Sequence, residues 1–150
     1  MMRGIAGRII AATALLCTGL AQAADTAPPF VPVTDAMIQN PDPSDWLSWR
    51  RTLDSWGYSP LDQIGKANVD QLRMVWVRPL DAGHQEGTPL VHDGVMYFPG
   101  PGDVITALDA ASGNVLWQYK RERPKDIDKF LTFPDTNRNL AIYGDLILGR

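Results

Sequence analysis

The feature that most constrains the fold is a series of short β-prone runs joined by tight turns, between Thr88 and Tyr119. The runs cover residues 89–91, 95–98, 104–108 and 115–119. Asp93-Gly94 joins the first two runs, and Asp-Gly between apolar runs is a strong hairpin signal because both central residues of that turn take positive φ. Pro and Gly residues at 99–102 separate the next two. The pattern therefore predicts a four-stranded antiparallel meander.

A sheet of this size does not bury both of its faces alone, so the pattern predicts neighbouring units stacked on it. Residues 140–143 and 146–148, separated by Gly144-Asp145, are expected to form the opening hairpin of a second unit. Because the sequence closes within that hairpin, we interpret residues 44–150 as the N-terminal part of a longer protein. The alternative is a complete small β domain with a frayed end.

The first 23 residues have the pattern of a signal peptide rather than of a domain. Arg3 and Arg8 precede an apolar run over residues 9–20, and residues 21–23 read Ala-Gln-Ala, the small-x-small pattern of a cleavage site. This predicts export. Residues 24–43 are rich in proline and lack periodicity, so they are expected to form an extended leader on the surface. Cys17 is the only cysteine, so a chain cleaved after Ala23 has no thiol in these residues.

Charge and hydropathy argue against nucleic-acid binding and against a transmembrane segment. The formal net charge is −3, and residues 24–150 contain 12 basic and all 17 of the acidic side chains. A nucleic-acid surface needs clustered Lys and Arg, which this distribution does not provide. The apolar run at 9–20 is shorter than the roughly 20 residues that span a bilayer. We therefore expect neither nucleic-acid binding nor a transmembrane segment.

Upstream of the meander the pattern is less regular. Residues 68–72 are expected to form a short helix that leads into a β-prone run at 74–77, ended by Pro79. Ser44 or Asp45 is a candidate cap for a helical turn reaching Trp49. His84 and His92 are eight residues apart and on different predicted turns, so an ordinary surface position is expected for both.

The run from Ala107 to Trp117 resembles the tryptophan-docking motif of quinoprotein dehydrogenases, A-x-D-x-x-T-G-K-x-x-W. Ala107, Asp109, Gly113 and Trp117 match, while Ser112 and Asn114 replace Thr and Lys. Asp109 is expected to bind the backbone of its own turn, Gly113 to supply positive φ, and Trp117 to pack its flat face on an adjoining sheet.

The segments before this motif extend the resemblance. Residues 58–64 (YSPLDQI), Asn68, Val69, Leu72, Trp76 and residues 85–97 (QEGTPLVHDGVMY) are similar, in order and spacing, to the amino-terminal end of the pyrroloquinoline quinone (PQQ)-dependent alcohol dehydrogenases related to methanol dehydrogenase. The similarity covers residues 44–150. It implies an all-β fold, the first blade and the start of the second in an eight-bladed periplasmic β-propeller that holds PQQ and Ca²⁺.

Two cofactor-binding residues are implied by the resemblance. Glu86 matches the family Glu that contacts a carboxylate of the quinone, and Arg138 matches the family Arg at the quinone's edge. The alternatives are a solvated loop acid and a surface arginine. Many members carry two adjacent cysteines five residues before the Arg, where this sequence has Thr132 and Phe133. Either Phe133 stacks on the quinone in their place, or this branch binds the cofactor differently.

The resemblance thus implies the opening of an enzyme that oxidises an alcohol by hydride transfer to PQQ and passes electrons to a periplasmic acceptor such as a cytochrome c. The Ca²⁺ ligands and the catalytic base are expected beyond residue 150, so the fragment alone is not expected to be active. The alternative function is a non-enzymatic propeller scaffold of the outer-membrane assembly type. That class shares the docking motif but not the upstream segments in this order.

Overall fold

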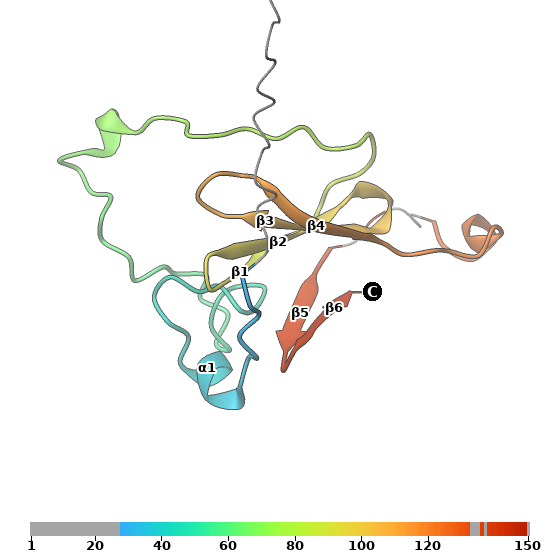
Figure 1. Cartoon of the computed structure of the whole chain (residues 1–150), viewed down its shortest axis with the longest axis horizontal. Helices are drawn as coiled ribbons and strands as arrows, with labels where there is room; N and C mark the ends of the chain where they lie inside the picture. Colours follow the sequence, from blue (N-terminus) through green and yellow to red (C-terminus); the bar gives the residue numbers. More distant parts are fainter. Residues whose placement is uncertain (1–27, 133–135, 137, 150) are drawn as a thin grey trace, which may run out of the picture.

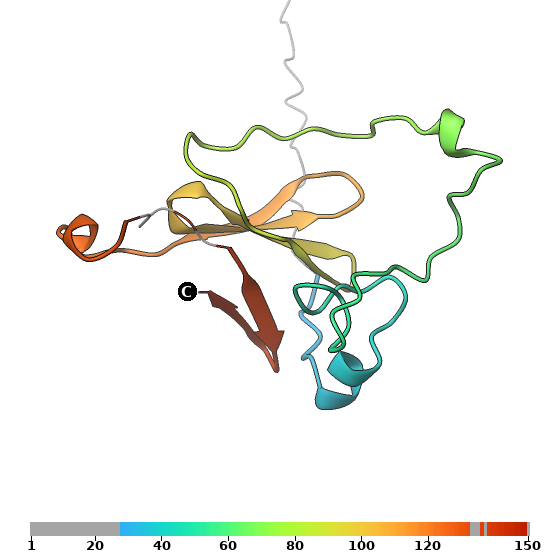
Figure 2. The same ribbon diagram turned by 180° about the vertical axis from the view of Figure 1, so that it is seen from behind.

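The structure is a computed structural model that describes residues 28–132, 136 and 138–149. The predicted signal peptide, Phe133 and Asn137 lie outside these residues. A four-stranded sheet occupies the centre, a two-stranded hairpin lies beneath it, and a long arm of irregular chain passes above it (Figures 1 and 2). Within the described ranges, no helix is long and apolar enough to cross a bilayer.

The central sheet is the predicted meander. Strands β1 (Leu90–His92), β2 (Val95–Gly100), β3 (Val104–Asp109) and β4 (Val115–Lys120) pair in sequence order, all antiparallel. At the β1–β2 turn, Asp93 and Gly94 have φ of 48° and 75°, as the Asp-Gly signal predicts. A short 3-10 turn, η2 (Pro101–Asp103), joins β2 to β3. The meander is therefore confirmed strand by strand.

The second hairpin is also present where it was predicted. Strands β5 (Leu140–Tyr143) and β6 (Leu146–Gly149) pair antiparallel, and Gly144 takes a positive φ of 57° in their turn. In its described residues, the charged segment between the two sheets contains the short 3-10 turn η3 (Ile127–Lys129).

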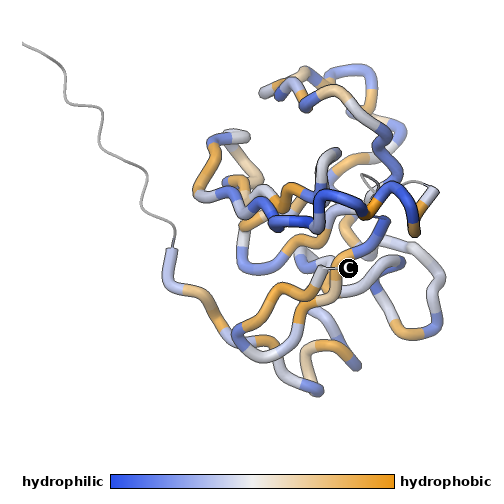
Figure 3. Tube along the Cα trace, turned by 90° about the vertical axis from the view of Figure 1, so that its right-hand side faces the viewer, coloured by the Kyte–Doolittle hydropathy of each residue, from blue (hydrophilic) through white to orange (hydrophobic). Residues whose placement is uncertain are grey.

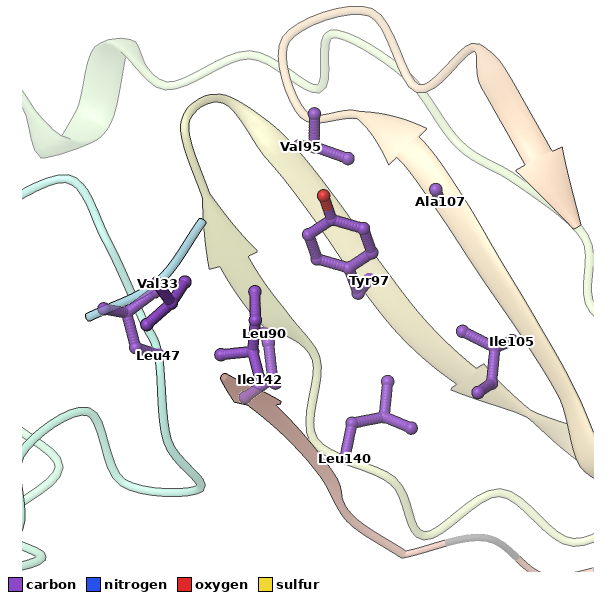
Figure 4. Packing of buried hydrophobic residues seen from close by; sticks show 9 residues of the cluster. All are labelled: Val33, Leu47, Leu90, Val95, Tyr97, Ile105, Ala107, Leu140 and Ile142. Carbon is purple, nitrogen blue, oxygen red and sulfur yellow. The ribbon is translucent and has the colours of Figure 1, made fainter. Parts of the chain in front are cut away.

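The core lies between the sheet and the hairpin. Figure 4 shows nine of its side chains, and β5 alternates buried and exposed residues as expected for a strand packed on one face. The members of this cluster are Val33, Leu47, Leu90, Val95, Tyr97, Ile105, Ala107, Leu140 and Ile142.

The leader is more closely integrated than the extended surface segment expected from sequence. Val33 is only 2% exposed, and its backbone exchanges two hydrogen bonds with Gly144, of 2.7 and 2.8 Å. Thr34 then caps a five-residue helix, α1 (Asp35–Gln39), by accepting a hydrogen bond from the Met37 N–H. The leader therefore supplies one core residue and covers the hairpin turn.

The segment expected to form a helical turn from Ser44 or Asp45 to Trp49 contains a β-bridge instead. Trp46 forms an isolated antiparallel bridge with Val91 of the edge strand β1, through hydrogen bonds of 2.8 and 3.0 Å. This bridge occupies backbone groups that an edge strand would otherwise leave exposed.

The arm between Arg51 and Gln85 differs most from expectation. The helix predicted at 68–72 is reduced to a single 3-10 turn, η1 (Val69–Gln71). The strand predicted at 74–77 is wrong for this structure: the backbone has no strand partner among the described residues, and Met74 and Val75 are 80% and 82% exposed. Figure 3 shows hydrophobic residues, in orange, both on outlying parts of the trace and in its interior.

Candidate functional site

Glu86 and Arg138, the two cofactor-binding residues predicted from sequence, lie together in the structure. Glu86 is in the loop that enters β1, and Arg138 is in the segment that enters β5. The Thr88 N–H donates a hydrogen bond of 3.2 Å to the Arg138 carbonyl, and Arg138 Nε lies 2.5 Å from Glu86 Oε2. An ion pair between residues 52 positions apart and a main-chain hydrogen bond from Thr88 therefore join the two segments.

This pair is open to solvent. The Glu86 and Arg138 side chains are 49% and 57% exposed. Exposed ion pairs typically contribute only about 0.2 to 1 kcal/mol to folding, since water screens them and two long side chains lose freedom. The ion pair therefore contributes little to the stability of the fold, and both side chains are accessible to a ligand.

The fit to a carboxylate-bearing quinone follows from the donor set. Guanidinium is a planar fork of five N–H donors that can bind one carboxylate through two parallel hydrogen bonds. Glu86 contacts the fork at Nε, and the terminal nitrogens of a guanidinium bound in this way can donate to a second acceptor. The residues present therefore fit the acidic edge of such a ligand. Of the two positions that replace the family's cysteines, Thr132 is exposed and Phe133 lies outside the described residues.

The docking motif forms the turn that its residues predict. Asp109 Oδ1 accepts hydrogen bonds from the Ser112 N–H and hydroxyl, both 2.7 Å, and the Gly113 N–H donates to the Asp109 carbonyl at 2.8 Å. These bonds stabilise the ionised carboxylate, so the Ser112 donors hold the pKa of Asp109 below its ordinary value. Gly113 takes φ of 73°, the predicted positive value.

Trp76 packs on this turn, and Trp117 packs on the sheet. Trp76 lies directly against Gly113, and its Nε1 donates to the Ala110 carbonyl at 3.2 Å. Trp117, on β4, packs its ring 6.0 Å from that of Tyr97. The arm residue Trp76 thereby docks on the blade, although the neighbouring Met74 and Val75 are exposed.

A hollow of about 500 Å³ lies between the arm and the sheet. Apolar side chains of β2 and β3 line it, and Arg78, Asp81, Thr106 and Gln118 add polar groups. Gln118 Nε2 donates to the Thr106 hydroxyl at 3.0 Å, which satisfies that buried threonine. Neither Glu86 nor Arg138 lines this hollow.

One polar cluster was not foreseen from sequence. His92, expected at the surface, is 3% exposed, and its Nδ1 lies 2.9 Å from Asp45 Oδ2. Its Nε2 lies 2.8 Å from the Val31 carbonyl, which only accepts, so Nε2 carries a hydrogen. Asp45 Oδ1 also accepts from the Asp93 N–H at 3.1 Å. The prediction of a surface position for His92 is wrong, because a carboxylate 47 positions away in sequence offsets the cost of burying its ring.

The described residues contain no cluster of three or more His, Cys, Asp or Glu positioned to hold a metal ion.

Comparison with known proteins bears on these features. The sequence model of a family described as "PQQ: Glucose/ethanol/alcohol dehydrogenase, beta-propeller domain" matches residues 46–145, two thirds of the chain. The quinone-type alcohol dehydrogenase, dehydrogenase subunit, of Gluconacetobacter polyoxogenes is 41% identical over 111 residues, which are 73% of this chain and 15% of that protein.

Solved structures agree with this match. Quinohemoprotein alcohol dehydrogenase ADHIIG of Pseudomonas putida HK5 superposes with a TM-score of 0.69 at 37% identity, over 77% of this chain and 17% of that one. A europium-containing methanol dehydrogenase gives 0.64 at 27% identity, over 75% and 20%. The chain therefore spans no more than about a fifth of the length of each of these proteins.

Proposed function

The chain belongs to the PQQ β-propeller family of glucose, ethanol and alcohol dehydrogenases, and on that premise we propose that it is the amino-terminal part of a periplasmic quinoprotein that oxidises an alcohol. The all-β propeller fold predicted from sequence is confirmed at the level of the family.

We propose that Glu86 and Arg138 hold the acidic edge of PQQ. The support is their meeting in one ion pair, tied by the Thr88–Arg138 hydrogen bond, at positions that resemble the family's quinone contacts. When bound, PQQ supplies a carbonyl group that accepts a hydride from the alcohol. Arg138 would neutralise a ligand carboxylate through its terminal nitrogens, and Glu86 would keep the guanidinium plane turned toward that carboxylate.

Location and partners complete the proposal. The signal-peptide pattern of residues 1–23 supports export to the periplasm. The metal is proposed to be Ca²⁺, held by residues outside this sequence, where it would act as a Lewis acid. The electron acceptor is proposed to be a cytochrome c or similar periplasmic carrier.

The observation that carries the proposal is the Glu86–Arg138 pair within a matched family segment. The test is to express the full-length gene product that contains this chain, remove cofactor, and add PQQ with Ca²⁺. We expect saturable PQQ binding and reduction of an artificial dye that depends on added ethanol or 1-butanol. A folded protein that binds no PQQ would overturn the proposal and favour the non-enzymatic scaffold. Mass spectrometry of the exported protein should place its N-terminus at Ala24 or within two residues of it, whereas an intact Met1 would contradict export.

A further inference from the structure

The loop that carries Glu86 is held in shape by groups on both sides of one peptide unit. The carbonyl of Gly87 accepts a hydrogen bond of 3.2 Å from the Gln85 side-chain amide. The N–H of Thr88, on the opposite side of the same peptide unit, donates to the Arg138 carbonyl at 3.2 Å. The Gly87–Thr88 peptide is therefore oriented from two directions.

This arrangement couples the backbone to the ion pair. Glu86 precedes the held peptide by one residue, and Arg138 contacts the loop twice, through its carbonyl and through Nε. A rotation of the Gly87–Thr88 peptide would break the link to Arg138, which is one of the two contacts that hold the Glu86 loop against Arg138. Glycine makes such rotation easy, since its φ and ψ are the least restricted of any residue. A restraint next to Gly87 therefore limits the conformations of the loop that carries Glu86.

We infer that Gln85 is a positioning residue for the cofactor site: its side-chain amide fixes the Gly87 carbonyl and so places Glu86 against Arg138. The inference rests on the proposed function. Gln85 itself is exposed, and its one described hydrogen bond is to its own loop. Its effect on the ligand is therefore indirect, through Glu86 and Arg138.

The test uses the full-length protein with Gln85→Ala and Gln85→Glu. Glutamate keeps the shape of glutamine but has no amide donor for the Gly87 carbonyl when ionised, so both variants lose the same bond. Gln71→Ala is the matched control, because Gln71 is also an exposed glutamine and lies on the arm. Affinity for PQQ in the presence of Ca²⁺ is measured by titration of the apo-protein, and exchange of the peptide spanning residues 85–91 by hydrogen–deuterium mass spectrometry.

Both Gln85 variants should bind PQQ roughly 3- to 10-fold more weakly, the range set by one ordinary hydrogen bond. They should also exchange the Thr88 amide faster, with kcat unchanged at saturating PQQ. Gln71→Ala should match the wild type in all three. Wild-type affinity in both Gln85 variants, in a protein whose Arg138→Ala form binds PQQ more weakly, would overturn the role of Gln85 alone. Absence of PQQ binding by the wild type would instead overturn the proposed function.

Discussion

Replacing Gly113 by alanine tests how the arm docks on the sheet. A Cβ added at Gly113 would lie 2.5 Å from Cδ2 and 2.7 Å from Cε3 of Trp76. These distances are far below a normal carbon–carbon contact of 3.5 to 4.0 Å. The ring is also held by the bond from its Nε1 to the Ala110 carbonyl, so it does not simply swing aside. The substitution must therefore displace the tryptophan or the turn.

Two costs add in this variant. An alanine at φ of 73° is in the left-handed region, at about 1 to 2 kcal/mol. Overpacking against the indole adds about 1 to 3 kcal/mol. Gly113→Ala should thus lower the free energy of opening of the β3–β4 turn by about 2 to 5 kcal/mol.

Gly94 provides the matched control. It has nearly the same φ, 75°, but nothing lies within 4 Å of an added Cβ. Gly94→Ala should therefore cost only the backbone part, about 1 to 2 kcal/mol. In a Trp76→Ala background, Gly113→Ala should fall to that same value, because the clashing ring is gone.

The assay is hydrogen–deuterium exchange of the full-length protein, read in peptides that cover residues 104–120 for Gly113 and 90–100 for Gly94, under conditions where exchange reports the opening equilibrium. Equal costs for Gly113→Ala and Gly94→Ala would refute the reasoning. So would an unchanged cost of Gly113→Ala after Trp76 is removed, since the clash would then have another origin.

Three further predictions concern other parts of the chain. Asp45→Ala removes the partner of buried His92 and should destabilise the leader by about 1 to 3 kcal/mol, the cost of leaving a buried polar group without its hydrogen bond. Asp45→Asn keeps hydrogen-bonding groups and should cost less. Limited proteolysis at residues 28–45 measures both variants, and equal resistance in Asp45→Ala and wild type would contradict the role of the pair. Ser112→Ala removes the hydroxyl that helps to lower the pKa of Asp109. A carboxyl whose pKa is lowered in the folded state stabilises the fold at pH values above its unfolded pKa of about 3.8, and this stability is lost as the pH falls through the folded pKa. Tryptophan fluorescence of the variant should therefore show acid unfolding that begins at a higher pH, and an unchanged acid transition would refute this. Residues 24–150 alone should unfold without a sharp thermal transition and bind a hydrophobic dye, because Trp56, Met74 and Val75 are among many exposed apolar side chains; a cooperative monomeric transition would count against this.

The parts of the fold that could be predicted from sequence are those in which neighbouring residues decide the structure. The β1–β2 turn follows from Asp93-Gly94, and the docking turn from Asp109 and Gly113, because the needed hydrogen bonds and dihedral angles lie within a few residues. The cap of α1 had the same kind of signal in Thr34-Asp35, which the proline-rich composition of the leader obscured.

The parts that could not be predicted depend on contacts distant in sequence. His92 is buried because Asp45 and Val31 satisfy its two ring nitrogens, and no local sequence pattern predicts either partner. Residues 74–77 have strand propensity, but a strand also needs a neighbouring strand, which the described residues do not supply. Glu86 and Arg138 were found through the family resemblance, whereas the loop geometry that joins them, including the bond from Gln85, required the structure.

The central claim, that Arg138 beside Glu86 binds a carboxylate of PQQ, is tested most directly by titrating the full-length apo-protein with PQQ in the presence of Ca²⁺. Arg138→Ala is compared with Arg73→Ala, an exposed arginine whose guanidinium contacts backbone carbonyls of its own segment. We predict that Arg138→Ala weakens PQQ affinity roughly 10- to 150-fold, the loss expected for a hydrogen bond to a charged group, and that Arg73→Ala leaves affinity unchanged. Equal affinity in the two variants would contradict the account.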